Sequence, residues 1–370
     1  MADLEIRVTE QDRYTEHQLM LAEQAVSGLA IVNLVMRVGV TAVHMGGIAG
    51  VWTDKNHRYK GYARRVLEHS NRWMAEHEYD CATLFGIDDF YDKFGYAVCL
   101  PDCRVEVRTR EAERASGTLA VRPFTPEDLP AVRELYASNN ADLTGSIVRD
   151  ETSSWLQKGS GYGVPVEVFV FTGGTDEIVA YAARDNTDEK VVVTEAGARH
   201  PRYYADIVRW AAERAVALRV ETIAFLIPPD SLLAAHLTLY GASQRLSFPR
   251  NGGGMGRILR LHDFFRKTLP EWTRRASAVP SLSAGTALRL ETDIGDLTLR
   301  WTGSAVELET TTQASGTVCL PQSRLMQLAM GYYSAALALS LPEMEARGDL
   351  SLFHALFPRR LAYMWQADHF

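Results

Sequence analysis

Few features of this sequence are typical of a secreted or membrane protein. The first residues contain no basic segment followed by an apolar one, so we expect no secretory signal. The longest apolar stretches, residues 28–36 and 331–341, are much shorter than the roughly 20 residues that a membrane-spanning helix needs. These absences predict a cytoplasmic protein without a membrane partner.

Cysteine is also scarce, with four residues in a chain of 370. They are Cys81, Cys99, Cys103 and Cys319. No cluster of His or Cys near Cys99 and Cys103 could complete a zinc site, so we expect no metal cofactor. In a reducing cytoplasm such thiols are expected to be buried or idle.

An excess of positive charge is absent as well. The chain has 39 Lys and Arg against 46 Asp and Glu, a formal net charge of −7. A general nucleic-acid-binding protein needs a clustered cationic surface, so we expect no nucleic-acid partner. An acidic enzyme would suit a cationic amine substrate, although this charge is also an ordinary setting for solubility. With 46% hydrophobic and 23% charged residues, the chain is expected to form two or three packed domains.

Three segments differ in their hydrophobic pattern. The first, which we assign to residues 1–110, has a helical pattern that places Tyr62, Val66, Leu67, Trp73 and Met74 on one side. Its predicted elements are strands at 17–23, 25–37, 45–53, 81–85 and 98–108, a helix at 56–76 and a helical turn at 88–94. This order predicts a mixed α/β layer.

The second segment, residues 118–275, follows a polar linker and repeats this order. Its predicted elements are strands at 119–123, 166–172, 177–183, 191–194, 222–227 and 256–261, and helices that begin near 126, 200 and 231. The third segment, residues 284–370, alternates apolar and polar residues at 288–292, 296–301 and 305–310, and continues with apolar helices at 322–338 and 349–357 and an apolar tail. We therefore expect an α/β (α+β) protein with two similar units and a separate C-terminal domain.

The strongest motif lies at residues 51–65, where a strand leads into a basic loop and a helix start. Arg58, Gly61 and Ala63 follow the pattern Arg-x-x-Gly-x-Ala. Free N–H groups at a helix start bind anions, Gly61 lets the backbone approach a pyrophosphate, and Ala63 keeps the second contact small. Arg58 and Lys60 can add charge-assisted contacts to phosphate. Taken alone, this hexapeptide also fits an ordinary basic helix start without a ligand.

A second motif, Tyr91-Asp-Lys-Phe-Gly-Tyr96, follows the next predicted strand. The two motifs together resemble the GNAT superfamily of acyl-CoA N-acyltransferases. The resemblance implies acetyl-CoA as co-substrate, held by Val51, Trp52, Thr53, Arg58, Tyr59, Lys60, Gly61, Tyr62 and Ala63, with the backbone of the first three on the pantetheine and acyl carbonyl. It also implies that Tyr91 is the general acid that protonates the leaving thiolate. The alternative is that Tyr91 packs in the core, as we expect for Tyr96.

The three segments together resemble the Eis (enhanced intracellular survival) family: two GNAT units, the second without the loop motif, and a sterol-carrier-protein-like domain. In the second unit, Pro201, Tyr203 and Tyr204 stand where small residues would be needed, so it is expected to be a scaffold. The resemblance implies a homo-oligomer, a hexamer in that family, and a general base formed by the α-carboxylate of Phe370. The alternative is a C-terminus that only packs between domains.

Only residues 1–15 precede the first hairpin, too few for the strand and two helices that usually line the acceptor site of a GNAT unit. Either the start of the chain was misassigned or cut, or the acceptor cleft is open on that side. Candidates for an aromatic, acidic pocket are Trp52, Trp73, Asp88 and Asp89. The predicted function is acetyl transfer to a primary amine of an aminoglycoside, a polyamine or a lysine-like acceptor. The alternative is a non-catalytic protein that binds lipids or small molecules in the C-terminal domain.

Overall fold

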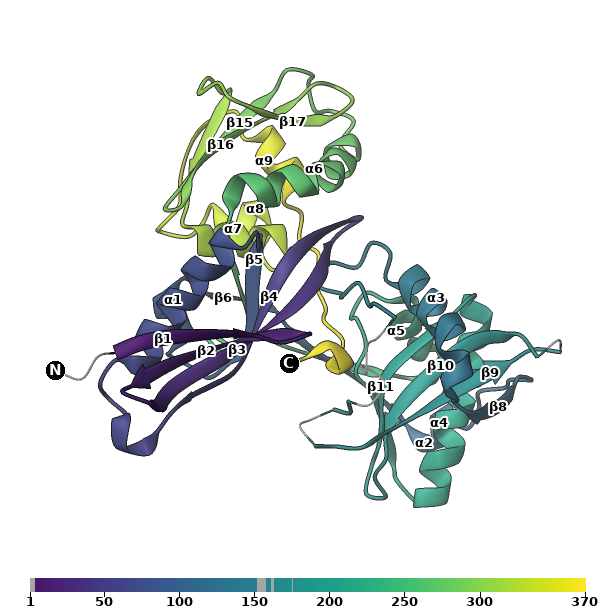
Figure 1. Ribbon diagram of the computed structural model, residues 1–370. Helices are drawn as coiled ribbons and strands as arrows, with labels where there is room; N and C mark the ends of the chain where they lie inside the picture. The colour runs from purple at the N-terminus through teal and green to yellow at the C-terminus, as the bar shows by residue number, and fades with distance from the viewer. Residues whose placement is uncertain (1–3, 152–157, 161–162, 175) are drawn as a thin grey trace. The chain divides into compact units, whose positions relative to one another are not determined.

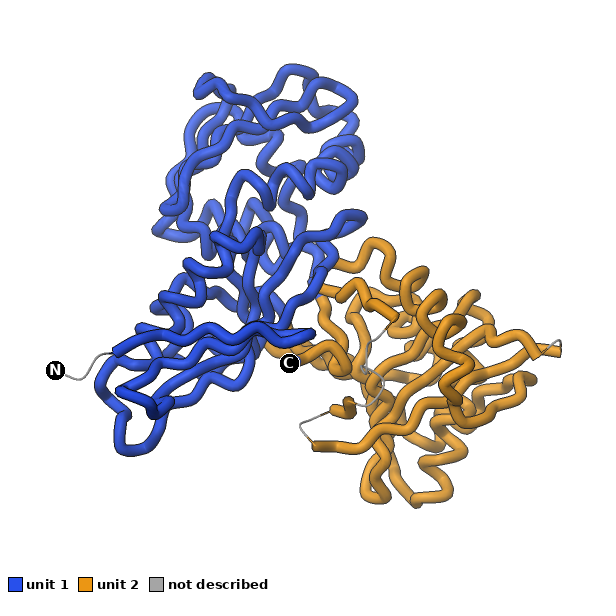
Figure 2. Tube along the Cα trace, in the orientation of Figure 1, with its two compact units in different colours: residues 1–100, 249–362, 370 blue, residues 101–248, 363–369 orange. Residues whose placement is uncertain are grey.

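The computed structural model describes residues 4–151, 158–160, 163–174 and 176–370. The chain divides into two compact units, each made of segments far apart in the sequence (Figure 2). Unit 1 comprises Met1–Leu100, Pro249–Ala362 and Phe370, and unit 2 comprises Pro101–Phe248 and Tyr363–His369. Across the described ranges, each helix is too short or too polar to traverse a lipid bilayer.

Unit 1 contains a mixed seven-stranded sheet (Figure 1). Its order is β1 (Leu4–Glu10), β2 (Tyr14–Leu21), β3 (Gln24–Val38), β4 (Thr41–Thr53), β5 (Cys81–Gly86), β14 (Gly253–Ile258) and β6 (Ala97–Leu100). Neighbours from β1 to β4 are antiparallel, whereas β4 and β5 are parallel and are connected through helix α1 (Tyr62–Glu76). The apolar side of α1 buries Val66, Leu67 and Met74, as its spacing predicts, whereas Tyr62 and Trp73 on the same side are half-buried.

The predicted strand at 98–108 is wrong, because the structure divides it between two sheets. β6 ends at Leu100 in unit 1, and β7 (Asp102–Arg108) belongs to the sheet of unit 2. Pro101 separates them, since proline has no N–H to continue a ladder. Conversely, β14, which was predicted to belong to the second segment, pairs with β5 and β6 in the sheet of unit 1. Each seven-stranded sheet therefore contains one strand from the segment that the sequence assigned to the other unit, β7 from residues 1–110 and β14 from residues 118–275.

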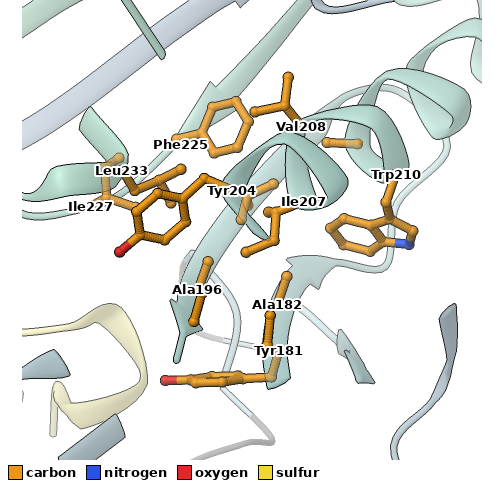
Figure 3. Close-up of a cluster of buried hydrophobic side chains, with 14 of the residues drawn as sticks. Tyr181, Ala182, Ala196, Tyr204, Ile207, Val208, Trp210, Phe225, Ile227 and Leu233 are labelled. Atoms are coloured by element: carbon orange, nitrogen blue, oxygen red, sulfur yellow. The ribbon is translucent and has the colours of Figure 1, made fainter. Parts of the chain in front are cut away.

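Unit 2 repeats the topology of the first sheet. Its order is β13 (Ser243–Ser247), β7, β12 (Thr222–Phe225), β11 (Val191–Ala198), β10 (Ile178–Asp185), β9 (Val166–Thr172) and β8 (Ala120–Pro123). The helices are α2 (Thr109–Ala112), α3 (Leu129–Asn139), α4 (Tyr204–Leu218) and α5 (Leu232–Leu237), with short 3-10 turns η3 (Pro126–Asp128), η5 (Pro201–Tyr203), η6 (Thr238–Tyr240) and η7 (Gln366–Asp368). β11 and β12 are parallel and are connected through α4, as β4 and β5 are through α1. In the core, Tyr204, Ile207 and Trp210 of α4 lie over Ala182 and Ala196 of the sheet (Figure 3).

The third segment forms a five-stranded sheet within unit 1. Its order is β17 (Val306–Glu309), β16 (Gly295–Trp301), β15 (Ala287–Thr292), β18 (Gly316–Cys319) and β19 (Glu345–Gly348). The predicted helix at 322–338 is two helices, α7 (Gln322–Ala329) and α8 (Ala335–Ala338), because Gly331 adopts a φ of +70° and its backbone packs against Arg360. The predicted strand at 256–261 is β14, which ends earlier and is followed by the unpredicted α6 (Leu261–Ser277). α9 (Ser351–Leu356) lies inside the helix predicted at 349–357. The mixed α/β class is confirmed.

Candidate active site

β4 and β5 separate within the sheet of unit 1. Their parallel register runs from Met45↔Cys81 to Ile48↔Leu84, although β4 continues to Thr53 and β5 to Gly86. The cause is a bulge in β4, where the register with β3 shifts and Gly50 adopts a φ of +56°. Such a bulge redirects a strand away from its neighbour. The end of β4, which carries Val51, Trp52 and Thr53, is thereby separated from β5.

The basic loop follows β4 directly. Asp54 caps the short helix η1 (Lys55–His57) through a 2.9 Å bond from the Asn56 N–H, and the Arg58 side chain donates to the Thr53 carbonyl at 3.4 Å. Arg58, Tyr59 and Lys60 are exposed, and Tyr59 is fully so. Any contribution of Tyr59 to binding a ligand therefore comes from its main chain.

The start of α1 is open to solvent and to ligand. Gly61 is the N-cap residue, with a φ of +78° and no side-chain cap, and a Cβ at Gly61 would meet no atom within 4 Å. The first intrahelical bond of this end runs from Arg65 N–H to the Gly61 carbonyl, so the amides of Tyr62 and Ala63 have no partner within the helix. Free N–H groups at the start of a 15-residue helix, beside two exposed cations, form a site suited to an anion. The structure thus brings the predicted loop residues together at one helix start.

Tyr91 begins η2 (Tyr91–Phe94), a turn closed by Gly95 with a φ of +78°. The ring is 8% exposed and packs so closely on Gly86 that no side chain would fit there. Gln322 of α7 supports the turn by donating to the Gly95 carbonyl at 2.5 Å. No hydrogen bond joins the Tyr91 hydroxyl to another residue of the described chain. Burial raises the pKa of Tyr91, so its phenol is protonated at neutral pH and can act as a proton donor.

Tyr96 has a different environment. Its hydroxyl donates to the Asn71 side-chain carbonyl at 2.6 Å, and both groups are buried. Burial raises the pKa of Tyr96 still further. This closed contact fits the structural role expected for Tyr96.

The C-terminal residue, Phe370, packs where β4 and β5 separate. A Cβ at Gly47 would lie 2.8 Å from the Phe370 ring, and the rings of Phe85 and Phe370 are 5.7 Å apart. The Phe370 α-carboxylate makes no ion pair or hydrogen bond with the residues that the structure describes. The carboxylate is therefore available to an external group.

The rings of Phe370 and Tyr91 contact adjacent residues of β5. Phe370 contacts Phe85, and Tyr91 contacts Gly86. Because successive residues of a strand face opposite sides of a sheet, the two rings lie on opposite faces of β5. The ring of the phenol and the ring of the C-terminal residue thus lie on the two sides of one strand end.

Other candidates from the sequence have structural contacts. Trp73 stacks on His77 with ring centroids 3.8 Å apart. Asp89 pairs with Arg250 at 2.6 Å. Both candidate rings also pack against glycines that were not singled out in the sequence, Phe370 against Gly47 and Tyr91 against Gly86. Glycine inside a strand is the signal that could have identified them.

Residues 3–99 match the family model described as an acetyltransferase (GNAT) domain. Solved structures that resemble nearly the whole chain include the following three. A conserved protein from Enterococcus faecalis V583 is 13% identical with a TM-score of 0.80, and 100% of each chain is covered. A GCN5-related N-acetyltransferase from Kribbella flavida is 17% identical with a TM-score of 0.73, covering 97% of this chain and 87% of the other. Eis1 from Mycobacterium abscessus is 16% identical with a TM-score of 0.68, covering 98% and 91%.

No curated protein sequence matches the chain. At these identities the solved structures show a shared fold, and the family model identifies residues 3–99 as a GNAT acetyltransferase domain. This domain contains the loop at residues 58–63 and Tyr91. The predicted GNAT-type enzyme is confirmed at this level.

Proposed function

We propose that this protein transfers an acetyl group from acetyl-CoA to a primary amine, as the resemblance to the Eis family implies. The observation that supports this most is the placement of Tyr91 and Phe370 on opposite faces of the end of β5, where β4 separates. A thioester in that gap would have its nucleophile approach from one face and its leaving group depart on the other. A base and an acid are needed on those two sides.

The donor would be held by the loop and the end of β4. The free N–H groups of Tyr62 and Ala63 donate to the pyrophosphate, which Gly61 lets approach the backbone. Arg58 and Lys60 add positive charge. The backbone of Val51 to Thr53 binds the pantetheine arm and the acyl carbonyl. These assignments extend the sequence prediction, and the free helix start and the strand separation support them.

The reaction proceeds by direct attack. The α-carboxylate of Phe370 takes a proton from the ammonium, and the neutral nitrogen forms a bond to the thioester carbonyl carbon. The C–S bond then breaks as the Tyr91 hydroxyl gives its proton to the departing sulfur, the attacking nitrogen releases its remaining extra proton to water, and the Tyr91 phenolate regains a proton from water. Burial keeps the pKa of Tyr91 above its usual value, so the phenol still carries its proton at neutral pH when the thiolate forms.

The acceptor belongs to the class of aminoglycosides, polyamines or lysine side chains. Residues 4–13 form β1 and the turn after it and contain no helix. The remaining proposals come from the resemblance: a cytoplasmic homo-oligomer, a hexamer in that family, and a sterol-carrier-like third domain that helps to place the C-terminus.

An acetyl-CoA consumption assay with one amine of each class tests the reaction, and a thermal-shift titration with CoA tests the donor site separately. We expect turnover with at least one class and stabilisation that rises with the concentration of CoA. Stabilisation by fatty acids or sterols alone, with no turnover, would overturn the proposal in favour of a lipid-binding protein.

A further inference from the structure

The last residues of the chain are anchored inside unit 2. The Tyr363 N–H donates to the Thr144 carbonyl at 2.9 Å, and the Trp365 indole donates to the Asn140 side chain at 2.8 Å. Tyr363, Trp365 and Ala367 belong to the buried core of the unit. The tail is therefore an integral part of unit 2 rather than a loose end.

The centre of this anchor is a buried guanidinium. Arg149 donates two bonds to Asp368, at 2.8 and 2.9 Å, and two to Glu195, at 2.7 and 2.6 Å. The three side chains are only 2%, 4% and 1% exposed, respectively. The Arg149 guanidinium also lies 3.6 Å from the centre of the Tyr136 ring, and the Tyr136 hydroxyl donates to Asp368 at 3.1 Å. We call Arg149, Glu195 and Asp368 the tail anchor.

Such a network contributes more to the positions of its side chains than to the free energy of unfolding. Two buried carboxylates share one cation, and burial raises the pKa of Asp368 even though Arg149 acts against this. Buried ion pairs often contribute no more to stability than apolar side chains of the same volume would. A guanidinium with two forked pairs does, however, fix the direction of both carboxylates. The tail anchor thus sets the position of Asp368.

The position of the tail anchor corresponds to the strand separation of unit 1. In unit 2 the parallel register of β11 and β12 ends at Val193↔Phe225, and Glu195 follows two residues later. In unit 1 the register ends at Ile48↔Leu84, and Gly50 follows two residues later. The tail turn η7 packs against β11. The place that would receive the acyl donor in unit 1 thus carries the anchor of the C-terminal tail in unit 2.

We propose that the strand separation of unit 2 is a binding site for the chain's own C-terminal tail, and that Arg149 is a positioning residue for the Phe370 α-carboxylate. This inference rests on the proposed function, in which that carboxylate is the base. Asp368 is two residues from the C-terminus, so fixing it confines the carboxylate to within about 7 Å. Lys158 shortens the free segment further, because its ammonium donates to the His369 carbonyl at 2.7 Å.

The test compares Arg149→Lys, which keeps the charge but loses the forked pairs, with the matched control Arg275→Lys. Arg275 is equally buried, pairs with Glu271 at 2.7 Å and stacks on Trp272, but contacts no residue of the tail within the described chain. Each variant is assayed with an amine that is protonated at pH 7 and with a weakly basic amine that is already neutral. Only the protonated amine needs the base.

We expect Arg149→Lys to lower kcat for the protonated amine by about tenfold or more, with little effect on the neutral amine or on KM for acetyl-CoA. Arg275→Lys should affect both amines equally. Adding an alanine after Phe370 should produce the same selective loss, and Arg149→Lys should add little to it. Suppose that Arg149→Lys lowers kcat equally with both amines, while the extended chain loses kcat only with the protonated amine. This result would overturn the positioning role of Arg149 and leave the proposed function intact.

Hydrogen exchange gives a readout that does not need turnover. Residues 363–369 should exchange faster in Arg149→Lys, and also in Asp368→Asn, than in the wild type or in Arg275→Lys. Unchanged exchange in both tail-anchor variants would refute the tail-binding site, whatever the acetylation assay shows. Absence of turnover in the wild type with every amine would instead refute the proposed function.

Discussion

The ring of Phe370, the last residue, packs against the backbone of Gly47 in β4, with only 2.8 Å between the ring and the position of a Cβ at Gly47. Real Cβ atoms do not approach other atoms so closely, so a side chain at residue 47 would displace the ring. The α-carboxylate is attached to the same residue and would move with it. Gly47 is therefore the residue of the sheet that most directly controls where the proposed base lies.

Gly47→Ala is expected to lower kcat with a protonated amine by about tenfold or more, because displacements near 1 Å are costly in catalysis. The affinity for CoA should change little, since the loop at residues 58–63 is untouched. Gly173→Ala is a matched control, because a Cβ there meets no atom within 4 Å. Steady-state kinetics and CoA titration check the prediction, and an unchanged kcat would argue that the terminal carboxylate is not the base.

Tyr91→Phe removes the proposed acid while leaving the ring that packs on Gly86. We expect kcat to fall about 10²-fold or more, the usual contribution of a general acid, with CoA affinity nearly intact. Tyr96→Phe is the control: it leaves a buried Asn71 carbonyl without its donor, so it should reduce stability by about 1–3 kcal/mol without a selective loss of chemistry. If Tyr91→Phe matches the wild type in turnover, Tyr91 is a core residue only.

The local features of the site could be predicted from the sequence, whereas its long-range contacts could not. Gly61 and the start of α1 at Tyr62 are neighbours in the chain, so their pattern was sufficient. The contact between Phe370 and Gly47, by contrast, depends on the tertiary fold. The same is true of β14, which pairs with β5 although the two strands lie in different halves of the sequence.

Errors at element boundaries also have physical causes. The break at Pro101 and the break at Gly331 each divide a run of apolar residues that reads as one element. α6 was not predicted, although it has 17 residues and a long buried face. It contains Pro270, and proline usually breaks a helix. In each case one residue type changed the outcome of an otherwise consistent pattern.

Gly61→Ala tests the donor site. Its φ of +78° is unfavourable for alanine, so the loop must either become strained or change its conformation, and we expect the Kd for CoA to rise about tenfold. Gly241→Ala carries the same backbone strain, with a φ of +71° and open space around it, but lies in unit 2. Calorimetric titration of CoA into both variants separates the effect of backbone strain from the loss of contacts to the pyrophosphate. Equal affinities in the two variants would exclude the loop as the pyrophosphate site.

The buried imidazole of His17 predicts how stability changes with pH. His17 is fully buried between β2 and α1, where it bonds to the Ser70 hydroxyl at 2.9 Å and contacts Trp73 edge-on. Burial, followed by the nearby His69 and His77, lowers its pKa from 6.5 to about 4. Between these values the unfolded chain binds a proton that the folded chain does not, so acidification favours unfolding.

A single site with these values would reduce the free energy of unfolding by about 2 kcal/mol between pH 7 and pH 5. His17→Gln removes the titrating group and keeps an amide that can bond to Ser70. Urea unfolding at the two pH values should therefore give a smaller difference for His17→Gln than for the wild type. Other groups titrate in both proteins and cancel in this comparison. Identical pH dependence in the two proteins would mean that His17 is protonated in the folded state or that its pKa is not lowered.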